Sequence, residues 1–195
     1  QEAHPCGPLR GAPCCISATV RSALGVIEFD GVSFAYGDRP VLDEASLTLE
    51  AGSLHFLTGR SGAGKTTLLR LAHLALAPDR GAVRLFGRDT AGLDRRARAR
   101  LRRRLGLVTQ DCTLLDHLCV AENIALPLRI AGEDPAARQD DVAAVAAWVG
   151  LADRMDALPP ELSSGERRRA EVARAVIAAP DALLADEPTG NVDAD

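Results

Sequence analysis

A glycine-rich segment with one lysine is the part of this sequence whose residue types and spacing most clearly predict chemistry. Residues 59–66 read GRSGAGKT and fit the pattern GxxxxGK[ST]. Glycines let the backbone wrap closely around phosphate oxygens, and successive N–H groups and the following helix start supply donors. In such a loop Lys65 contacts the β- and γ-phosphates and the Thr66 hydroxyl is a magnesium ligand. The alternative, a plain glycine turn with a surface lysine, is disfavoured because a predicted strand precedes the loop and an apolar helix follows it.

The composition singles out the same lysine. The chain has 23 basic residues, and every one except Lys65 is an arginine. An ammonium is a compact point charge, whereas a guanidinium is a planar fork. We infer that this position needs a point charge.

Two adjacent acids follow an apolar run near the end of the chain. The run 182–185 reads ALLA and is followed by Asp186 and Glu187. A cation held by phosphates needs an oxygen ligand at the end of a neighbouring strand, which suits Asp186. Glu187 is suited to orienting or deprotonating the attacking water. Paired acids at a strand end are often only solvated, so this interpretation depends on the phosphate loop.

The segment LSSGE at 162–166 opens an amphipathic helix. Its simplest interpretation is a capping box, in which Ser163 and Glu166 satisfy the first backbone donors of the helix. The functional interpretation is a second anion site at the helix N-terminus, directed at a γ-phosphate.

Short apolar and β-branched runs predict strands at 26–29, 32–36, 46–49, 54–58, 83–86, 105–109 and 182–185. Helical patterns cover 65–75, 94–104, 135–149 and 164–178. In the third, Val142, Val145, Ala146 and Val149 repeat with helical spacing, so one face is predicted to be buried. We expect an α/β fold: a P-loop NTPase core with a mostly parallel sheet flanked by helices, an N-terminal antiparallel β part and an inserted helical subdomain.

The bulk composition narrows the function. The 195 residues suffice for one sizeable core, and the net charge of -4 disfavours general nucleic-acid binding. No apolar run approaches the ~20 residues that span a bilayer. The cysteines lack paired spacing, so free thiols in a reducing cytoplasm are expected rather than a zinc site or disulfides; they are Cys6, Cys14, Cys15, Cys112 and Cys119.

Taken together, these motifs resemble the nucleotide-binding domains of ABC ATPases, and the resemblance covers nearly everything from about residue 26 to residue 195. It rests on Tyr36, GRSGAGKT (59–66), Gln110, LSSGE (162–166), LLADE (183–187) and GNVD (190–193). The segments FLTGRSGAGKTTLLRL, ENIALPLRIAG and LLADEPTGNVD most resemble the FtsE-type subfamily of cell-division ATPases, which pair with the integral membrane protein FtsX. Lipoprotein-release and macrolide-exporter ATPases share the DEPTGN ending.

The resemblance implies ATP and Mg2+ as ligands and a role for each site residue. Tyr36 would stack on adenine, Gln110 would sense magnesium and water, and Asp193 would lie at a dimer seam. Two chains would enclose two ATP molecules as a homodimer, each site using one chain's Lys65 loop and the other's Ser163 segment. The implied catalytic residues are Glu187, Lys65 and Gln110, and the implied metal ligands are Thr66, Gln110 and Asp186. The implied nucleotide-binding residues are Tyr36, Gly59, Arg60, Ser61, Gly62, Ala63, Gly64, Lys65, Thr66, Thr67, Ser163 and Gly165.

An FtsX-like membrane protein is the implied partner, which would place the chain in the cytoplasm, peripheral on the inner face of the plasma membrane. Candidate docking residues are Leu114, Leu115 and Leu118, with ordinary core packing as the alternative. We expect residues 1–24 to be a flexible leader or an artefact, and 25–195 to be an ATP-binding domain with its helical subdomain at about 111–178.

Two departures from the family pattern affect the expected activity. Ser164 stands where the family usually has glycine, and the chain stops at Asp195, before the family's switch histidine and its remaining strands. We therefore expect the C-terminal end of the core to be missing, and ATP to be bound better than it is hydrolysed. A nucleotide-binding module without turnover is the corresponding alternative function, beside a lipoprotein-release or macrolide-type exporter subunit.

Overall fold

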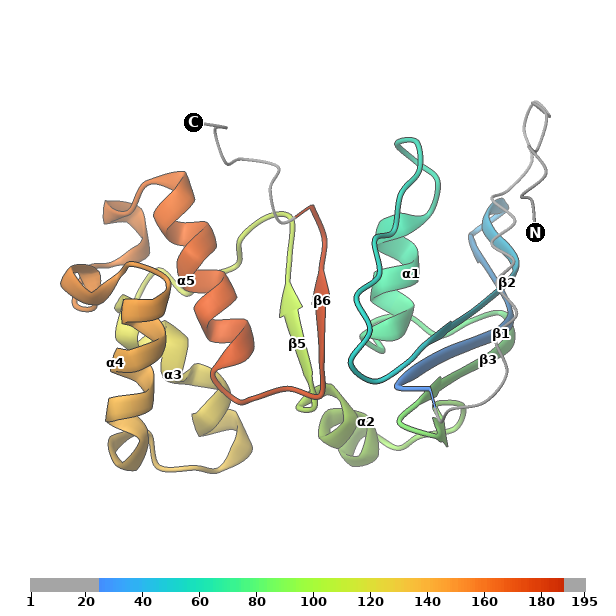
Figure 1. Cartoon of the computed structure of the whole chain (residues 1–195). Coiled ribbons are helices and arrows are strands. Elements are labelled where there is room, and N and C mark those ends of the chain that lie inside the picture. The colour runs from blue at the N-terminus through green and yellow to red at the C-terminus, as the bar shows by residue number, and fades with distance from the viewer. Residues whose placement is uncertain (1–24, 188–195) are drawn as a thin grey trace. The chain divides into compact units, whose positions relative to one another are not determined.

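The computed structural model of the protein describes residues 25–187. The chain divides after Ala91 into two compact units, which are described separately below (Figure 1). The segments 1–24 and 190–193, including Asp193, lie outside the described residues, as do Cys6, Cys14 and Cys15.

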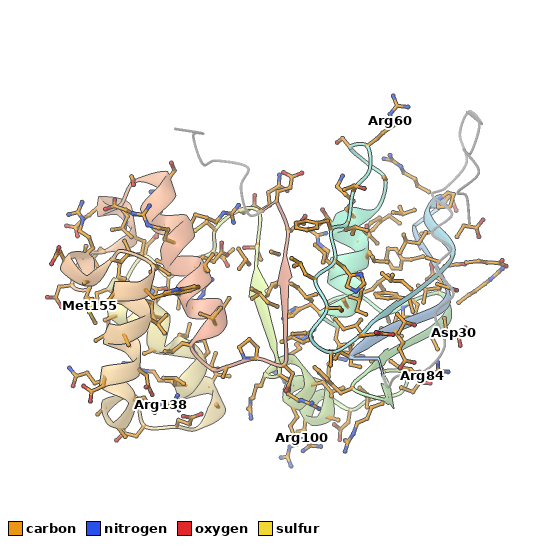
Figure 2. The ribbon with its side chains drawn as sticks, in the orientation of Figure 1. Asp30, Arg60, Arg84, Arg100, Arg138 and Met155 are labelled. Atoms are coloured by element: carbon orange, nitrogen blue, oxygen red, sulfur yellow. The ribbon has the colours of Figure 1, made fainter. Side chains whose placement is uncertain are left out.

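The first unit contains a four-stranded antiparallel sheet in the order β2-β1-β3-β4 and one helix. The strands are β1 (Ile27–Tyr36), β2 (Arg39–Leu49), β3 (Arg80–Leu85) and β4 (Arg88–Asp89). Across β1 and β3, Arg84 and Asp30 form an ion pair with an Nη1–Oδ2 distance of 3.4 Å, and both residues are labelled in Figure 2. The predicted antiparallel N-terminal part is confirmed.

Strand β1 joins two runs that the sequence predicts as separate strands. Phe29 pairs with Leu47 and Val32 pairs with Ala45, so β1 has one extra residue at this point. Gly31 adopts a φ of 58°, which glycine tolerates at no steric cost, and the result is a β-bulge. The bulge shifts the alternation of buried side chains by one residue, which explains why the hydrophobic pattern breaks without the strand ending.

The prediction of a buried strand at 54–58 is wrong. This segment forms no strand, and Leu54 and Phe56 are 80% and 82% exposed. An apolar run becomes a buried strand only where neighbouring strands offer backbone partners, and the sheet of this unit pairs its four strands without it.

Helix α1 (Lys65–Ala72) follows the glycine-rich loop and buries Leu68 and Leu71. It ends earlier than the predicted 65–75, because Leu74 takes up a left-handed conformation with a φ of 59°. The helix therefore begins at the predicted lysine and is about two turns long.

The second unit contains a parallel pair of strands, β5 (Leu105–Val108) and β6 (Ala182–Ala185), and four α-helices. These are α2 (Arg95–Arg102), α3 (Val120–Ala131), α4 (Gln139–Trp148) and α5 (Ser164–Val176), with short 3-10 turns at Pro135–Arg138, Ala152–Arg154 and Pro159–Glu161. Among the described residues, parallel pairing is confined to β5 and β6, and no helix is long and apolar enough to cross a membrane.

Helices α3, α4 and α5 pack on one another around a shared apolar core (Figure 1). The predicted buried face of α4 is confirmed, because Val142 and Ala146 are buried and Val145 and Val149 pack against them. The core is completed by Val120, Ile124, Ala125, Leu128, Leu151, Leu162, Ala170, Ala173 and Ile177. The predicted α/β class, with helices placed between strands, is confirmed.

Candidate nucleotide site

The glycine-rich loop of the first unit closes around the lysine that the sequence singles out. The Lys65 Nζ donates to the carbonyl oxygens of Gly59 at 2.9 Å and Arg60 at 3.1 Å. Ala63 N also donates to Arg60 O at 3.1 Å. The Arg60 side chain points outward from the tip of the loop, and Ser61 and Gly62 are exposed beside it (Figure 2). The ammonium is therefore held in the curve of the loop, where a phosphate would meet it.

Gly64 sets the start of α1. Its φ is 91°, and a Cβ at this position would lie 3.1 Å from Leu42 Cδ2 and 3.2 Å from Val41 O. The helix has no side-chain cap at Gly64 and no acid in its first turn, so among the described residues no carboxylate competes for its first N–H groups. Uncapped donors at a positive helix end fit an anionic ligand. Thr66 is half-buried here, whereas Thr67 is buried.

Tyr36 ends β1, on the hairpin whose second strand also contacts Gly64. The residue is 45% exposed, and its ring makes an edge-to-face contact with Phe34, with ring centroids 4.9 Å apart. Tyr36 is thus partly accessible, as the predicted adenine contact requires.

The second unit brings three of the other predicted residues together. The parallel register pairs Val108 with Ala185, so the residues after β5 and β6 leave the sheet at the same edge. Asp186 N donates to Val108 O at 3.0 Å, and Gln110 Nε2 donates to Glu187 Oε2 at 3.0 Å. Glu187 is exposed and has a φ of 47°, a conformation that non-glycine residues rarely adopt.

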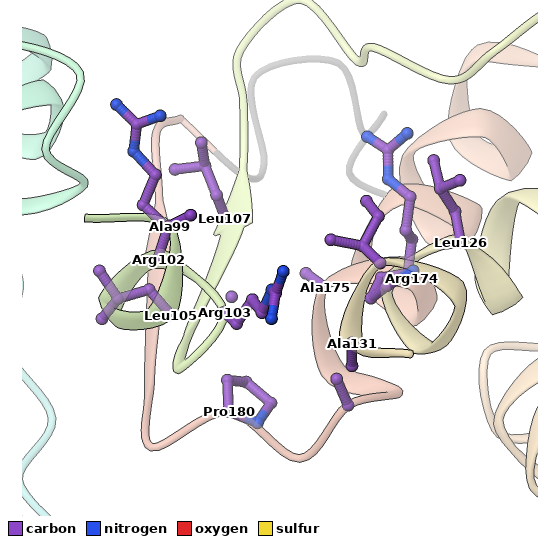
Figure 3. A pocket seen from close by; sticks show the side chains of 14 residues that line it. Ala99, Arg102, Arg103, Leu105, Leu107, Leu126, Ala131, Arg174, Ala175 and Pro180 are labelled. Atoms are coloured by element: carbon purple, nitrogen blue, oxygen red, sulfur yellow. The ribbon is translucent and has the colours of Figure 1, made fainter. Parts of the chain in front are cut away.

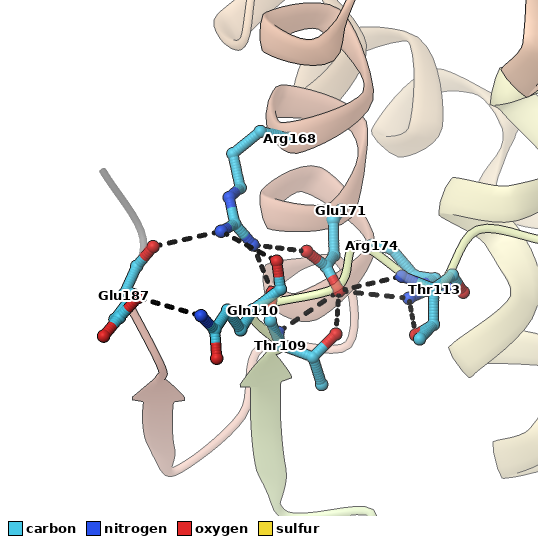
Figure 4. Close-up of polar contacts among 7 residues, drawn as sticks. All are labelled: Thr109, Gln110, Thr113, Arg168, Glu171, Arg174 and Glu187. Atoms are coloured by element: carbon cyan, nitrogen blue, oxygen red, sulfur yellow. Dashed lines mark hydrogen bonds and ion pairs between the residues drawn. The ribbon is translucent and has the colours of Figure 1, made fainter. Parts of the chain in front are cut away.

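A buried ionic network next to this pair was not predicted from the sequence (Figure 4). Helix α5 contributes Arg168, Glu171 and Arg174, and the Glu171 side chain is completely buried. The arginines at 167–169 lie within the helix predicted at 164–178. The missed signal is the spacing, since these three residues recur at steps of three among the buried alanines Ala170 and Ala173.

At the start of α5 the structure contains the capping box. Ser163 Oγ accepts from Glu166 N at 3.2 Å, and Ser163 N donates to Glu166 Oε2 at 2.8 Å. Ser164 is exposed and Gly165 is half-buried. The Ser163 backbone and hydroxyl, followed by the Arg154 guanidinium, lower the pKa of the Glu166 carboxyl to about 2.

The predicted magnesium ligands offer a hydroxyl, a carboxylate and an amide oxygen, the hard donors that Mg2+ prefers. Thr66 belongs to the first unit, whereas Gln110 and Asp186 belong to the second. The hydrogen bond to Glu187 uses the Gln110 nitrogen and leaves its amide oxygen for a metal. Among residues 25–187, no group of three or more His, Cys, Asp or Glu side chains could hold a metal ion.

Comparisons with known proteins show which family the chain belongs to. Residues 42–190 match the family profile described as ABC transporter. The lipoprotein-releasing system ATP-binding protein LolD of Maricaulis maris is 45% identical over 175 residues, which cover 87% of this chain and 76% of LolD. The cell division ATP-binding protein FtsE of Haemophilus influenzae is 42% identical over 170 residues, covering 86% and 78%.

A solved structure shares the fold. The dimeric bacterial ABC transporter cassette MJ0796 superposes with a TM-score of 0.80 at 28% identity, covering 86% of this chain and 76% of that one. The chain belongs to the ABC transporter family, and it is the ATP-binding, ATP-hydrolysing domain of that family. The predicted family and ATPase activity are confirmed. Because both LolD and FtsE are similar to the chain, these comparisons leave its subfamily open.

The capping box predicts a pH dependence of stability. The folded pKa of Glu166 is about 2 and its ordinary value is 4.5, so its stabilising effect is fully present above about pH 4.5 and is lost as the pH falls toward 2. Urea unfolding should show Glu166→Gln less stable than the wild type at pH 6, with the difference shrinking at pH 4 and pH 3. A difference that is the same at every pH would contradict this assignment.

Proposed function

We propose that the chain is the ATP-hydrolysing subunit of an FtsE-type complex that drives an integral membrane partner in cell division. The observation that carries hydrolysis, rather than binding alone, is the hydrogen bond between Gln110 and Glu187. It joins the side chain proposed to sense the metal and water to the one proposed to act on the water. Peripheral attachment to the cytoplasmic face of the plasma membrane follows from this proposal.

Each residue of the proposed site has a separate task in this mechanism. Lys65 and the first N–H groups of α1 bind the phosphates, and the Tyr36 ring positions the base. Mg2+, when bound, neutralises charge on the phosphate oxygens, with Thr66, Asp186 and Gln110 as its proposed protein ligands. Glu187 accepts a proton from the attacking water, and Gln110 holds that carboxylate in place.

A homodimer completes the proposed site. The MJ0796 cassette with a TM-score of 0.80 is described as dimeric. In the proposed dimer the Ser163 segment of one chain faces the nucleotide held by Lys65 of the other. Since the Ser163 hydroxyl is engaged in the capping box, its segment would present mainly backbone N–H groups and the positive end of α5.

A lipoprotein-releasing complex is the second candidate, favoured by the 45% identity to LolD. The FtsE proposal rests on the segments around the phosphate loop and the ENIALPLRIAG stretch. The two candidates share the same ATP chemistry and differ in the membrane protein that is bound, so the partner decides between them.

The loop between β5 and α3 is the proposed docking surface. Leu115 is 38% exposed at its centre, whereas Leu114 packs against the helical core, so the core-packing alternative holds for Leu114. The buried Asn123 fixes the loop: its Oδ1 accepts from Leu115 N at 2.8 Å and its Nδ2 donates to Leu118 O at 2.8 Å. The surface is therefore preorganised.

A pocket of about 390 Å³ lies in the same unit (Figure 3). It lies among α2, β5, α3 and α5, and its lining combines apolar side chains with Arg102, Arg103 and Arg174. Arg174 connects it to the loop by donating to Thr113 O at 2.7 Å. An amphipathic segment of the membrane partner with acidic residues matches this combination.

Lys65→Ala should weaken Mg-ATP binding strongly, because no other lysine can replace the lost charge. A charge-assisted contact to phosphate is worth about 2–3 kcal/mol, or roughly 30- to 150-fold in Kd. Isothermal titration of the variant measures this directly. The exposed Arg70 of α1 supplies the control, since Arg70→Ala should bind normally. Unchanged affinity in Lys65→Ala would remove the phosphate-loop assignment.

Glu187→Gln should preserve ATP binding and stop turnover, because the amide keeps the shape of the side chain and loses its basicity. An ATP-bound dimer should then accumulate, visible by size exclusion with ATP. Asp140→Asn, at an exposed position of α4, is the control. Normal hydrolysis without an ATP-dependent dimer would show that Glu187 is not the general base.

Co-expression should move the chain to the membrane fraction with an FtsX-like protein, and not with the membrane component of a lipoprotein-releasing system. Leu115→Glu should abolish this recruitment by placing a charge in the apolar contact. Leu158 is 40% exposed, close to the 38% of Leu115, so Leu158→Glu is a matched control. Recruitment only by the lipoprotein-system component would favour the second candidate.

A further inference from the structure

One arginine of α5 holds the backbone at both residues of the proposed catalytic pair. The Arg168 guanidinium donates through Nη2 to Gln110 O at 3.3 Å and to Glu187 O at 3.0 Å. Its Nη1 donates to Thr109 O as well. The side chain is only 7% exposed, so these contacts are shielded from water. All of the residues involved lie in the second unit.

Glu171 holds that arginine in place. Its Oε2 lies 3.0 Å from Arg168 Nη1, and its Oε1 accepts from Thr109 Oγ1 at 2.7 Å and from Thr109 N at 3.2 Å. A second cation, Arg174, lies 3.7 Å from Oε1. A buried carboxylate with this many donors is satisfied in essentially one arrangement, because each lost partner leaves a desolvated charge.

We propose that Arg168 is a positioning residue for ATP hydrolysis, acting by fixing the main chains of Gln110 and Glu187 relative to each other. The inference rests on the proposed function of that pair. Because one planar guanidinium binds both carbonyls, it sets the separation of the two backbones and hence the 3.0 Å contact between their side chains. It also supports the left-handed backbone conformation of Glu187, which is strained for a residue other than glycine.

The geometry distinguishes arginine from lysine at this position. A lysine would keep the charge, but its single nitrogen could replace only one end of the guanidinium: either Nη1, which contacts Thr109 O and Glu171, or Nη2, which contacts the carbonyls of Gln110 and Glu187. A displacement of about 1 Å at a reacting group lowers the rate roughly a hundredfold. We therefore expect a lysine at this position to preserve folding through its positive charge and to impair catalysis because it lacks the second nitrogen.

The experiment measures kcat, KM for ATP and urea stability for Arg168→Lys, Arg168→Gln and the double variant R168Q/E171Q. Arg168→Lys should fold with near-normal stability and lose about 10- to 100-fold in kcat, with KM within about twofold. The double variant removes both buried charges, so it should be more stable than Arg168→Gln and equally slow. Arg169→Gln, at the exposed neighbouring position, should match the wild type.

The outcomes separate this inference from the function on which it rests. A folded Arg168→Lys with wild-type kcat would overturn the positioning role. So would a double variant that regained kcat together with stability, since Arg168 would then serve folding alone. A wild-type chain that binds Mg-ATP and hydrolyses none would overturn the proposed function itself, and this inference with it.

Discussion

A carboxylate that is completely removed from water must be matched by donors, and Glu171 imposes that requirement on the second unit. Desolvating a charge costs several kcal/mol, so the carboxylate determines the conformation of the backbone that supplies its N–H groups. That backbone is the irregular segment after β5, which has no ladder partner of its own. Asn123 does the same for the following residues with neutral hydrogen bonds. A loop without secondary structure is thus held by side chains from two helices.

The first unit differs, because its proposed ligand is an anion that binds and dissociates. Its loop uses main-chain geometry rather than buried charge: Gly64 turns the chain into α1 without a side-chain cap. The Lys65 ammonium donates to two carbonyls of its own loop. Phosphate oxygens can replace these acceptors with little reorganisation, since the lysine is already drawn over the loop.

The elements with strong local signals were predictable from the sequence. The loop at 59–66, the capping box at Ser163 and the buried face of α4 each depend on spacing within one segment. The pairing of segments that lie far apart in the sequence was harder to predict. The run at 54–58 looks like a buried strand by composition, yet burial depends on partners that composition does not show. The bulge at Gly31 shifts the alternation of buried side chains by one residue, so the sequence pattern does not show that β1 is one continuous strand. Arg168 was missed for a related reason, since its contacts join segments up to 59 residues apart.

Every other basic residue of this chain is an arginine, so Lys65 is chemically unique. It carries the only side-chain primary amine in 195 residues, and that amine lies within the glycine-rich loop proposed to bind phosphate. Acylating reagents directed at lysine side chains therefore have one destination, and protection of that amine by a bound nucleotide would report occupancy of this loop alone. Cellular acetylation of a lysine side chain would likewise act at this single point, removing the charge on which the phosphate contact depends.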